Sequence, residues 1–187
     1  ASELCAAIPA KTNVSSAQII FDVANACDIN PQVLIVLLEK EQSLVRDVWP
    51  LRSQLNKATG FACPDTAPCD PAFGGFFYQV YYAARQFKVY QKYPDRYNYV
   101  AGRNNNIYYH PDLARCGHSP VYIENQATAA LYIYTPYQPN SAALNNLYGT
   151  GISGGCSQNG SEAPTDLVAL LAWMTQDGWQ SLQTLKK

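Results

Sequence analysis

Residues 30–45 read NPQVLIVLLEKEQSLV, and this stretch decides the fold class of the chain. Asn30 can cap a helix, and Pro31 suits its first turn because proline has no amide hydrogen to leave unpaired there. The apolar residues that follow predict the most strongly apolar helix of the chain, running to about Val45. The architecture is therefore expected to be built on helices.

Further helices are predicted on both sides of this stretch. Ser15 and Ser16 precede AQIIFDVANACDI, whose apolar residues recur at helical spacing. Residues 76–93, FFYQVYYAARQFKVYQKY, predict another helix, which Pro94 stops, and a further one is expected at 125–134. Prolines and glycines over 49–76 indicate a long ordered loop.

The remaining segments complete a mainly α fold. Residues 96–123 mix tyrosine, asparagine and β-branched residues with turn formers, which suits irregular structure or a short β-hairpin. We expect a single domain over 1–187, with a core at about 15–148 that ends in a short helix at 141–149. A Gly/Ser-rich loop at 149–164 and a C-terminal helix at 165–185 follow.

Composition narrows the function classes. Hydrophobic residues make up 48% of the 187 residues and charged residues 14%, which is typical of a globular protein. The net charge of −1 gives no general attraction to nucleic acid. No apolar run approaches the roughly 20 residues that span a bilayer, and the first residues do not resemble a signal peptide. We expect a soluble, processed monomer without a membrane span.

The cysteines indicate an oxidising compartment. The chain has six, an even and high number for a cytosolic protein of this size: Cys5, Cys27, Cys63, Cys69, Cys116 and Cys156. Because no Cys-x2-Cys pair occurs, disulfides are favoured over zinc. Sequence alone leaves the pairing open, although Cys63 with Cys69 would close a short loop. We expect a secreted protein.

Glu41 is the strongest candidate catalytic residue. Its helix neighbours three and four positions away are Leu37, Leu38, Leu44 and Val45, all apolar. A carboxyl group in such surroundings tends to have a raised pKa and to stay protonated, as a general acid requires. The alternative is a buried ion pair or a cap on a loop amide.

Glu39 is the weaker candidate of the two. Its neighbours at helical spacing are Ile35, Val36, Gln42 and Ser43, a mixed face that predicts an easier route to solvent. Asp47, Asp65, Asp70 and Glu124 lie in or beside loops and are interpreted as caps or solvated charges.

The run from Asn30 to Val45 resembles the first motif of the lysozyme-like soluble lytic transglycosylases. In that family Asn/Asp-Pro opens an apolar helix that carries the catalytic Glu about three turns later, and the resemblance assigns this role to Glu41. Gln42 stands where the family usually has Ser. The segment from Gly75 to Gln79 is similar to a second motif, Gly-Leu-Met-Gln, and implies sugar contacts for Tyr78 and Gln79. AALYIYTPYQPN is a degenerate form of the third motif, in which Tyr134 or Tyr137 replaces the family's Tyr.

The wider pattern also resembles secreted actinobacterial proteins assigned to the same group. Together these segments cover roughly residues 28–140. The resemblance implies a lysozyme-like fold and, as the partner, peptidoglycan glycan strands of the cell wall. It further implies cleavage between N-acetylmuramic acid and N-acetylglucosamine by a single Glu, acting first as acid and then as base. No metal or cofactor is implied.

Tyrosine is unusually common, and its ring suits a sugar groove beside Asn and Gln. The best candidate cluster contains Tyr97, Asn98, Asn104 to Asn106 and Tyr108. Packing in the core or at a rim is the alternative for many of the 14 tyrosines.

The segment around Cys116 and the function each allow an alternative interpretation. His110 and His118 flank Cys116, but a metal or Cys-His site fails if Cys116 is oxidised, and a histidine that orders a turn is the simpler interpretation. The rival functions are a hydrolytic lysozyme (muramidase) and a non-catalytic module that binds or adheres to cell-wall glycan.

Overall fold

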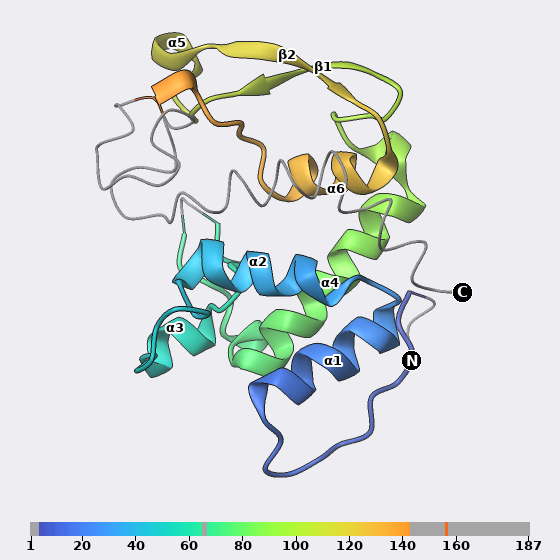
Figure 1. Ribbon diagram of the computed structural model, residues 1–187, viewed down its shortest axis with the longest axis vertical. Coiled ribbons are helices and arrows are strands. Elements are labelled where there is room, and N and C mark those ends of the chain that lie inside the picture. The colour runs from blue at the N-terminus through green and yellow to red at the C-terminus, as the bar shows by residue number, and fades with distance from the viewer. Residues whose placement is uncertain (1–3, 65–66, 143–155, 157–187) are drawn as a thin grey trace. The chain divides into compact units, whose positions relative to one another are not determined.

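The computed structural model describes residues 4–64, 67–142 and 156 (Figure 1). The chain divides into two compact units, Ala1–Val89 (unit 1) and Tyr90–Lys187 (unit 2). The described part is largely helical and contains a two-stranded antiparallel sheet, which confirms the mainly α class. The prediction that 1–187 forms one domain stays a prediction.

Unit 1 is made of helices joined by an ordered loop. They are α1 (Ser16–Cys27), α2 (Pro31–Gln42), α3 (Arg52–Asn56), the 3-10 turn η1 (Pro71–Phe73) and α4 (Phe76–Lys92), whose last turn belongs to unit 2. The helices predicted after Ser15, after Asn30 and from Phe76 are confirmed. The long loop expected over 49–76 is interrupted by α3 and η1. Buried residues of the three long helices include Val23, Leu34, Val80, Ala84 and Phe87.

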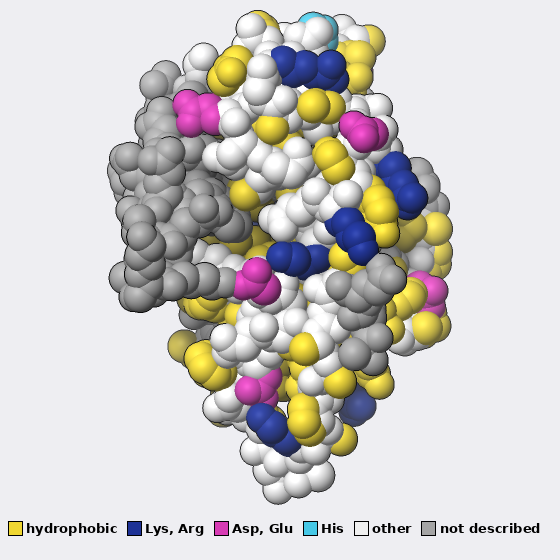
Figure 2. All heavy atoms as spheres, turned by 90° about the vertical axis from the view of Figure 1, so that its right-hand side faces the viewer, with side chains coloured by type: hydrophobic (Ala, Val, Ile, Leu, Met, Phe, Trp, Pro, Cys, Tyr) yellow, Lys and Arg dark blue, Asp and Glu magenta, His cyan; other side chains and the backbone are white. Residues whose placement is uncertain are grey.

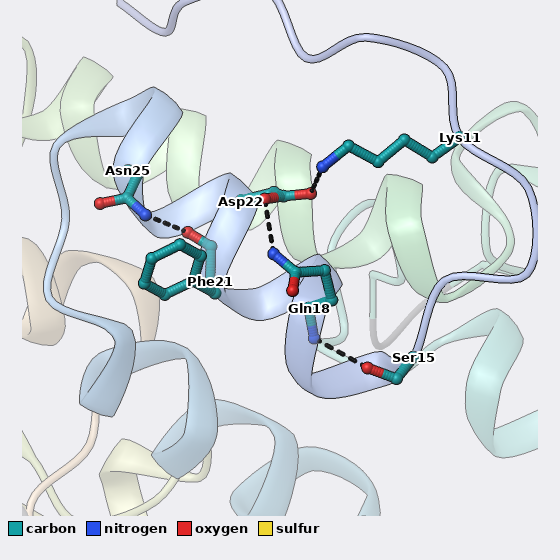
Figure 3. A network of polar contacts seen from close by, with 6 residues as sticks. All are labelled: Lys11, Ser15, Gln18, Phe21, Asp22 and Asn25. Atoms are coloured by element: carbon teal, nitrogen blue, oxygen red, sulfur yellow. Dashed lines mark hydrogen bonds and ion pairs between the residues drawn. The ribbon is translucent and has the colours of Figure 1, made fainter.

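Polar contacts fix the start of α1 and tie it to the preceding segment (Figure 3). Ser15 is the N-cap, and its hydroxyl accepts a hydrogen bond from the Gln18 amide at 3.2 Å. The Asp22 carboxylate accepts hydrogen bonds from the Lys11 ammonium at 2.6 Å and from the Gln18 side-chain amide at 2.9 Å. The Lys11 bond first, and the Gln18 bond second, hold the pKa of Asp22 below its ordinary value.

All six cysteines form disulfides. The pairs are Cys5–Cys27, Cys63–Cys69 and Cys116–Cys156. The first bridge attaches the N-terminal segment to the end of α1, and the second closes the short loop predicted from sequence. Disulfides of this number are typical of proteins from oxidising compartments.

Unit 2 places a β-sheet against a helix (Figure 1). Its elements are η2 (Pro94–Arg96), β1 (Arg103–Tyr108), α5 (Leu113–Cys116), β2 (His118–Ile123) and α6 (Gln126–Tyr134). The strands are antiparallel, with Arg103 opposite Ile123 and Tyr108 opposite His118. Buried Ile107, Ile123 and Ala129 form the core between the sheet and α6.

The chain after α6 returns to the sheet. Tyr137 forms an isolated bridge with Tyr108, and the Gln138 amide donates to the Tyr108 carbonyl at 2.8 Å. The Gln138 side chain also donates to the carbonyls of Ile107 and Ser119. Residues 136–138 are thereby fixed beside β1.

Two findings complete the fold. Among the described residues, no helix is both long enough and apolar enough to cross a membrane. The predicted C-terminal helix at 165–185 lies outside the described residues. Of the predicted helix at 141–149 only residues 141 and 142 are described, and of the 149–164 loop only Cys156.

Candidate functional site

Glu41 lies in the last turn of α2, whose start the sequence defines well. The Asn30 side chain accepts a hydrogen bond from the Gln32 amide at 2.9 Å, and Pro31 occupies the first turn. Leu34, Leu37 and Leu38 are buried on the inner side of the helix. Packing of this face sets the direction in which the end of α2 projects.

The helix ends at Gln42, three residues earlier than predicted. Ser43 adopts a left-handed conformation and its amide donates to the carbonyls of Glu39 and Leu38, which closes the helix. Leu44 and Val45 therefore do not stand one turn above Glu41, and Val45 is exposed. Of the four apolar neighbours predicted for Glu41, only Leu37 and Leu38 occupy helical positions beside it.

The Glu41 carboxylate has two different surroundings for its two oxygens. The Lys40 ammonium lies 2.5 Å from Oε1, and the Glu41 side chain is 23% exposed. On the other side lies Gly60, at which a Cβ atom would come within 2.9 Å of Oε2. Gly60 has a φ of +68°, a conformation that glycine adopts without strain. The approach of this loop to the carboxylate therefore depends on a glycine.

Glu39 is the more enclosed of the two glutamates, contrary to the prediction from its helix face. Its side chain is 13% exposed, and Oε1 accepts the Arg46 guanidinium at 2.6 Å. Oε2 accepts from the amides of Val45 and Arg46, at 3.1 and 3.3 Å. Because α2 stops at Gln42, the chain turns back over Glu39 and uses its carboxylate as a cap. Glu39 thus has a structural role.

Gln79 of α4 holds the loop that carries Gly60. The Gln79 side chain is 1% exposed, and its Oε1 accepts from the Thr59 amide at 3.2 Å. Its Nε2 donates to the carbonyls of Phe61 and Phe73, at 3.0 and 2.9 Å. Both ends of the carboxamide are therefore occupied by the chain itself. Gln79 positions Gly60 against Glu41, while the predicted sugar contact of Gln79 stays a prediction.

Tyr78 lies beside Gln79 on α4 but is exposed. Its ring contacts those of Phe77 and Tyr82, with centroids 5.6 and 6.4 Å apart. Tyr82 also stacks on Phe61, so the aromatic cluster extends to the loop beside Gly60. Tyr78 is the member of this cluster that offers most of its ring to a ligand in solution.

Unit 2 contains a pocket of about 800 Å³. It brings together the predicted residues Tyr97, Asn98 and Tyr108 with Tyr137, which sequence placed in a separate motif. The other described lining residues are mostly polar. They are Arg96, Tyr99, Arg103, Asn104, Asn105, Asn106, Pro111, Ile133 and Pro136. Predicted Tyr134 is not among them; its ring lies 6.5 Å from that of Tyr90.

The pocket wall has a buried amide of its own. Asn105 is buried, and its Oδ1 accepts from the Val100 amide while its Nδ2 donates to the carbonyls of Val100 and Arg103, each at 2.9 Å. Asn104 and Asn106 on either side are exposed. Alternation along β1 therefore gives Asn105 a structural role and leaves its two neighbours for a ligand.

The phenol groups of Tyr99, Tyr108 and Tyr137 lie near one another in this pocket. Burial raises the pKa of Tyr99 above its ordinary value, and the nearby phenols of Tyr108 and Tyr137 raise it further. A tyrosine hydroxyl is protonated at neutral pH even at its ordinary pKa, so the Tyr99 hydroxyl can donate a hydrogen bond. Sequence reasoning missed Tyr99, Arg96 and Arg103, because their approach to Tyr137 depends on the return of the chain to β1.

Asp70, Asp47 and His110 have structural roles. Asp70 caps η1, and Asp47 accepts the Trp49 amide at 2.8 Å, a bond that lowers the pKa of Asp47 together with a second from Gln54. His110 accepts the Asp112 amide in a turn, and Cys116 is oxidised, so the Cys-His alternative has no thiol. Asp65 lies outside the described residues, and Glu124 is exposed.

Within the described part of the chain, no group of three or more His, Cys, Asp and Glu residues could hold a metal ion. Comparisons with known proteins find no matching family model, curated protein or solved structure. Glu41 in unit 1 and the pocket in unit 2 are the two candidate functional sites of the described chain.

Proposed function

We propose that this protein is a secreted, lysozyme-like lytic transglycosylase that cleaves the glycan strands of the bacterial cell wall. Its target is the bond between N-acetylmuramic acid and N-acetylglucosamine, and Glu41 is the catalytic residue. The observation that carries the proposal is the contrast between the two glutamates. The Glu39 carboxylate binds Arg46 and two loop amides. The Glu41 carboxylate lies against Gly60, its side chain is 23% exposed, and it pairs with the flexible side chain of Lys40.

The chemistry needs only one carboxyl group. Glu41 donates its proton to the bridging oxygen as the bond from that oxygen to the sugar C1 breaks. The sugar's own 6-hydroxyl then attacks C1, and its proton passes to the Glu41 carboxylate. The N-acetyl group of the substrate supports the positive charge at C1, so no enzyme nucleophile is needed. The product is a 1,6-anhydro-muramoyl end, and the proton on Glu41 is restored.

The ion pair between Lys40 and Glu41 opposes the first step, in which Glu41 gives up a proton. The Lys40 ammonium is 2.5 Å from Glu41 Oε1, and an ion-paired carboxylate has no proton to give. Lysine has a long flexible stem, so an arriving saccharide can displace the ammonium from the carboxylate. The proposed first step therefore requires that Glu41 carry a proton when the saccharide is bound.

The second candidate function is a module that binds cell-wall glycan without cleaving it. The Lys40–Glu41 ion pair favours this candidate, because it gives Glu41 a structural partner. The tyrosine- and asparagine-lined pocket of unit 2 suits sugar binding, and the lining residues that the structure describes include no acidic one. The two candidate functions differ in whether Glu41 has a chemical role.

Substitution of the two glutamates gives a matched test of the proposal. Glu41→Gln removes the transferable proton and is expected to abolish clearing of a cell-wall suspension, a loss of at least about 100-fold. Glu39→Gln is the control, and it should retain clearing while losing about 1 kcal/mol of stability with its ion pair and caps. Full clearing by Glu41→Gln would remove the catalytic assignment.

Product analysis separates the functions. Purified peptidoglycan is incubated with the protein, and the soluble products are identified by mass spectrometry. Anhydro-muropeptides support the transglycosylase, and reducing ends indicate that water replaces the 6-hydroxyl, as in a hydrolytic muramidase. Unchanged peptidoglycan together with measurable binding to it would establish the non-catalytic module instead.

A further inference from the structure

The pocket of unit 2 has a distinct charge. Among the described residues that line it, Arg96 and Arg103 are cationic and none is Asp or Glu. Within residues 4–64, 67–142 and 156, neither guanidinium has a carboxylate at ion-pair distance. Asp112, next to lining residue Pro111, is directed to Arg115, which it pairs with at 3.8 Å. The described lining residues therefore leave the positive charge of these two arginines uncompensated.

This charge is a local property of the pocket. On the face drawn in Figure 2, basic and acidic side chains of the described residues are interspersed, in keeping with the net charge of −1. The protein thus has no general attraction for polyanions, and an anion would have to be recognised by particular groups. Arginine suits this role because its planar guanidinium presents several donors to a carboxylate or a phosphate.

Arg96 is held in position by an aromatic ring. Its guanidinium lies over Tyr93, 4.1 Å from the ring centroid, and the residue ends the 3-10 turn η2 that Pro94 begins. Arg103 is at the first position of β1, where the Asn105 side chain binds its carbonyl. Both arginines are exposed, so their guanidinium groups are accessible to a ligand. Pre-positioning reduces the entropy that binding must remove.

The other lining residues are those that recognise sugars. Tyr97 and Tyr108 offer aromatic faces, and Asn98, Asn104 and Asn106 are exposed amides that can bond hydroxyl groups. Tyr99 offers a hydroxyl donor, as shown above. A volume of about 800 Å³ is within the range of small-molecule sites and leaves room for a short oligosaccharide.

We propose that the pocket of unit 2 selects saccharides that carry acidic groups, with Arg96 and Arg103 binding the acid and the Tyr and Asn side chains binding the sugar. Either a carboxylate or a phosphate supplies this chemistry. The inference extends the proposed function by naming the charge of the saccharide, and rests on it only in taking the pocket to be a sugar site. It does not require Glu41 to be catalytic.

Binding of a matched pair of oligosaccharides to the full chain tests this inference. The probes are tetragalacturonate and its methyl ester, which differ in charge and not in sugar backbone. Titration calorimetry should show the acid binding at least about tenfold more tightly than the ester, because charge-assisted hydrogen bonds are lost on esterification. Raising the salt concentration to about 0.5 M should weaken the binding of the acid and leave the binding of the ester unchanged. Equal affinities for acid and ester would overturn the inference.

Substitutions locate the effect. Arg96→Gln and Arg103→Gln should each weaken tetragalacturonate binding by about fivefold to tenfold without altering the ester. Arg115→Gln is the matched control, since it removes the same charge from unit 2 at a residue that does not line the pocket. Unchanged binding in both pocket variants, or an equal loss in Arg115→Gln, would contradict the assignment.

A third arm separates the two sources of the acid. Glucose 6-phosphate and galacturonate, each titrated as a monosaccharide against neutral glucose, show whether phosphate or carboxylate is preferred. The expected result is that at least one acid binds and that glucose does not. If none of the acidic probes binds, the inference fails, whereas the cell-wall assays on Glu41 test the cleavage proposal independently.

Discussion

In each unit a buried side-chain amide fixes a loop through hydrogen bonds to its backbone. This residue is Gln79 in unit 1 and Asn105 in unit 2. Gln79 reaches Thr59 and Phe61, which lie 20 and 18 residues away along the chain. Asn105 bonds Val100 and Arg103, which lie five and two residues away. One amide thus connects distant segments, and the other shapes its own turn.

The difference determines what each amide can control. Because Gln79 joins α4 to the loop at 59–61, its loss would release Gly60 from the Glu41 carboxylate. Loss of Asn105 would change only the wall of the pocket between Val100 and Arg103. Gln79 therefore constrains the arrangement of two elements, whereas Asn105 constrains a single turn.

Removal of the Gln79 amide is expected to have the largest effect. Gln79→Leu keeps the volume but leaves the Thr59 amide and the carbonyls of Phe61 and Phe73 without these partners in a buried site, at a cost of about 3 kcal/mol. Denaturant unfolding measures this loss, and cell-wall clearing should fall with it. Gln91→Leu on the same helix is the control and should cost less than about 0.5 kcal/mol. Equal losses would show that Gln79 has no special role.

Asn105→Leu should destabilise less, by about 2 kcal/mol, because it leaves the Val100 amide and two nearby carbonyls unpaired in a unit that can relax locally. Binding of tetragalacturonate should weaken, while cell-wall clearing by Glu41 chemistry should change less than in Gln79→Leu. The exposed neighbour Asn104 supplies the stability control, as Asn104→Leu. A stability loss in Asn104→Leu as large as that in Asn105→Leu would contradict the buried role of Asn105.

Gly60→Ala tests the contact with Glu41 directly. The new Cβ would approach Oε2 to 2.9 Å and would be strained at a φ of +68°, so we expect a loss of about 1 kcal/mol and at least a tenfold fall in clearing rate. Gly117 has a φ of +69°, and a Cβ added there would meet no atom within 4 Å. Gly117→Ala should therefore lose stability and keep its clearing rate. Retained clearing in Gly60→Ala would argue against a need for this close contact.

The smallest effect is expected at Asp22, which belongs to neither of these two loops. Its pKa in the folded protein lies below the ordinary value of 3.8, so the stability it adds is fully present above that value. This contribution disappears as the pH falls through the folded pKa. The difference in unfolding free energy between the wild type and Asp22→Asn should be constant above about pH 5 and shrink below about pH 4. A difference that does not change with pH would exclude the ionised form of Asp22 as its source.

Local signals in the sequence were enough for most of the helices. Asn30 caps α2 as predicted, and the helices expected after Ser15 and from about Asn125 begin there, with these two residues as their caps. A cap needs only the next two or three amides, so its signal is local. The short loop closed by Cys63 and Cys69 is local in the same sense. The end of α2 was predicted wrongly, since Leu44 and Val45 continue the apolar pattern although Ser43 has already turned the chain.

The candidate sites depended more on tertiary structure. Tyr97, Asn98 and Tyr108 could be grouped because they are close in sequence, and the pocket contains all three. The identity of the enclosed glutamate could not be predicted, because Glu39 is covered by chain that turns back beyond the helix end. The Gly60 contact with Glu41 joins residues that share no pattern.

The sequence by itself determined the helical class, the helix starts, the cysteine chemistry and the grouping of Tyr97, Asn98 and Tyr108, because each depends on neighbours a few residues away. Only the tertiary structure decided which glutamate is enclosed, which amides are structural and which arginines face the pocket. These outcomes follow from the path of the chain after each element ends, and that path is set by packing over the whole unit.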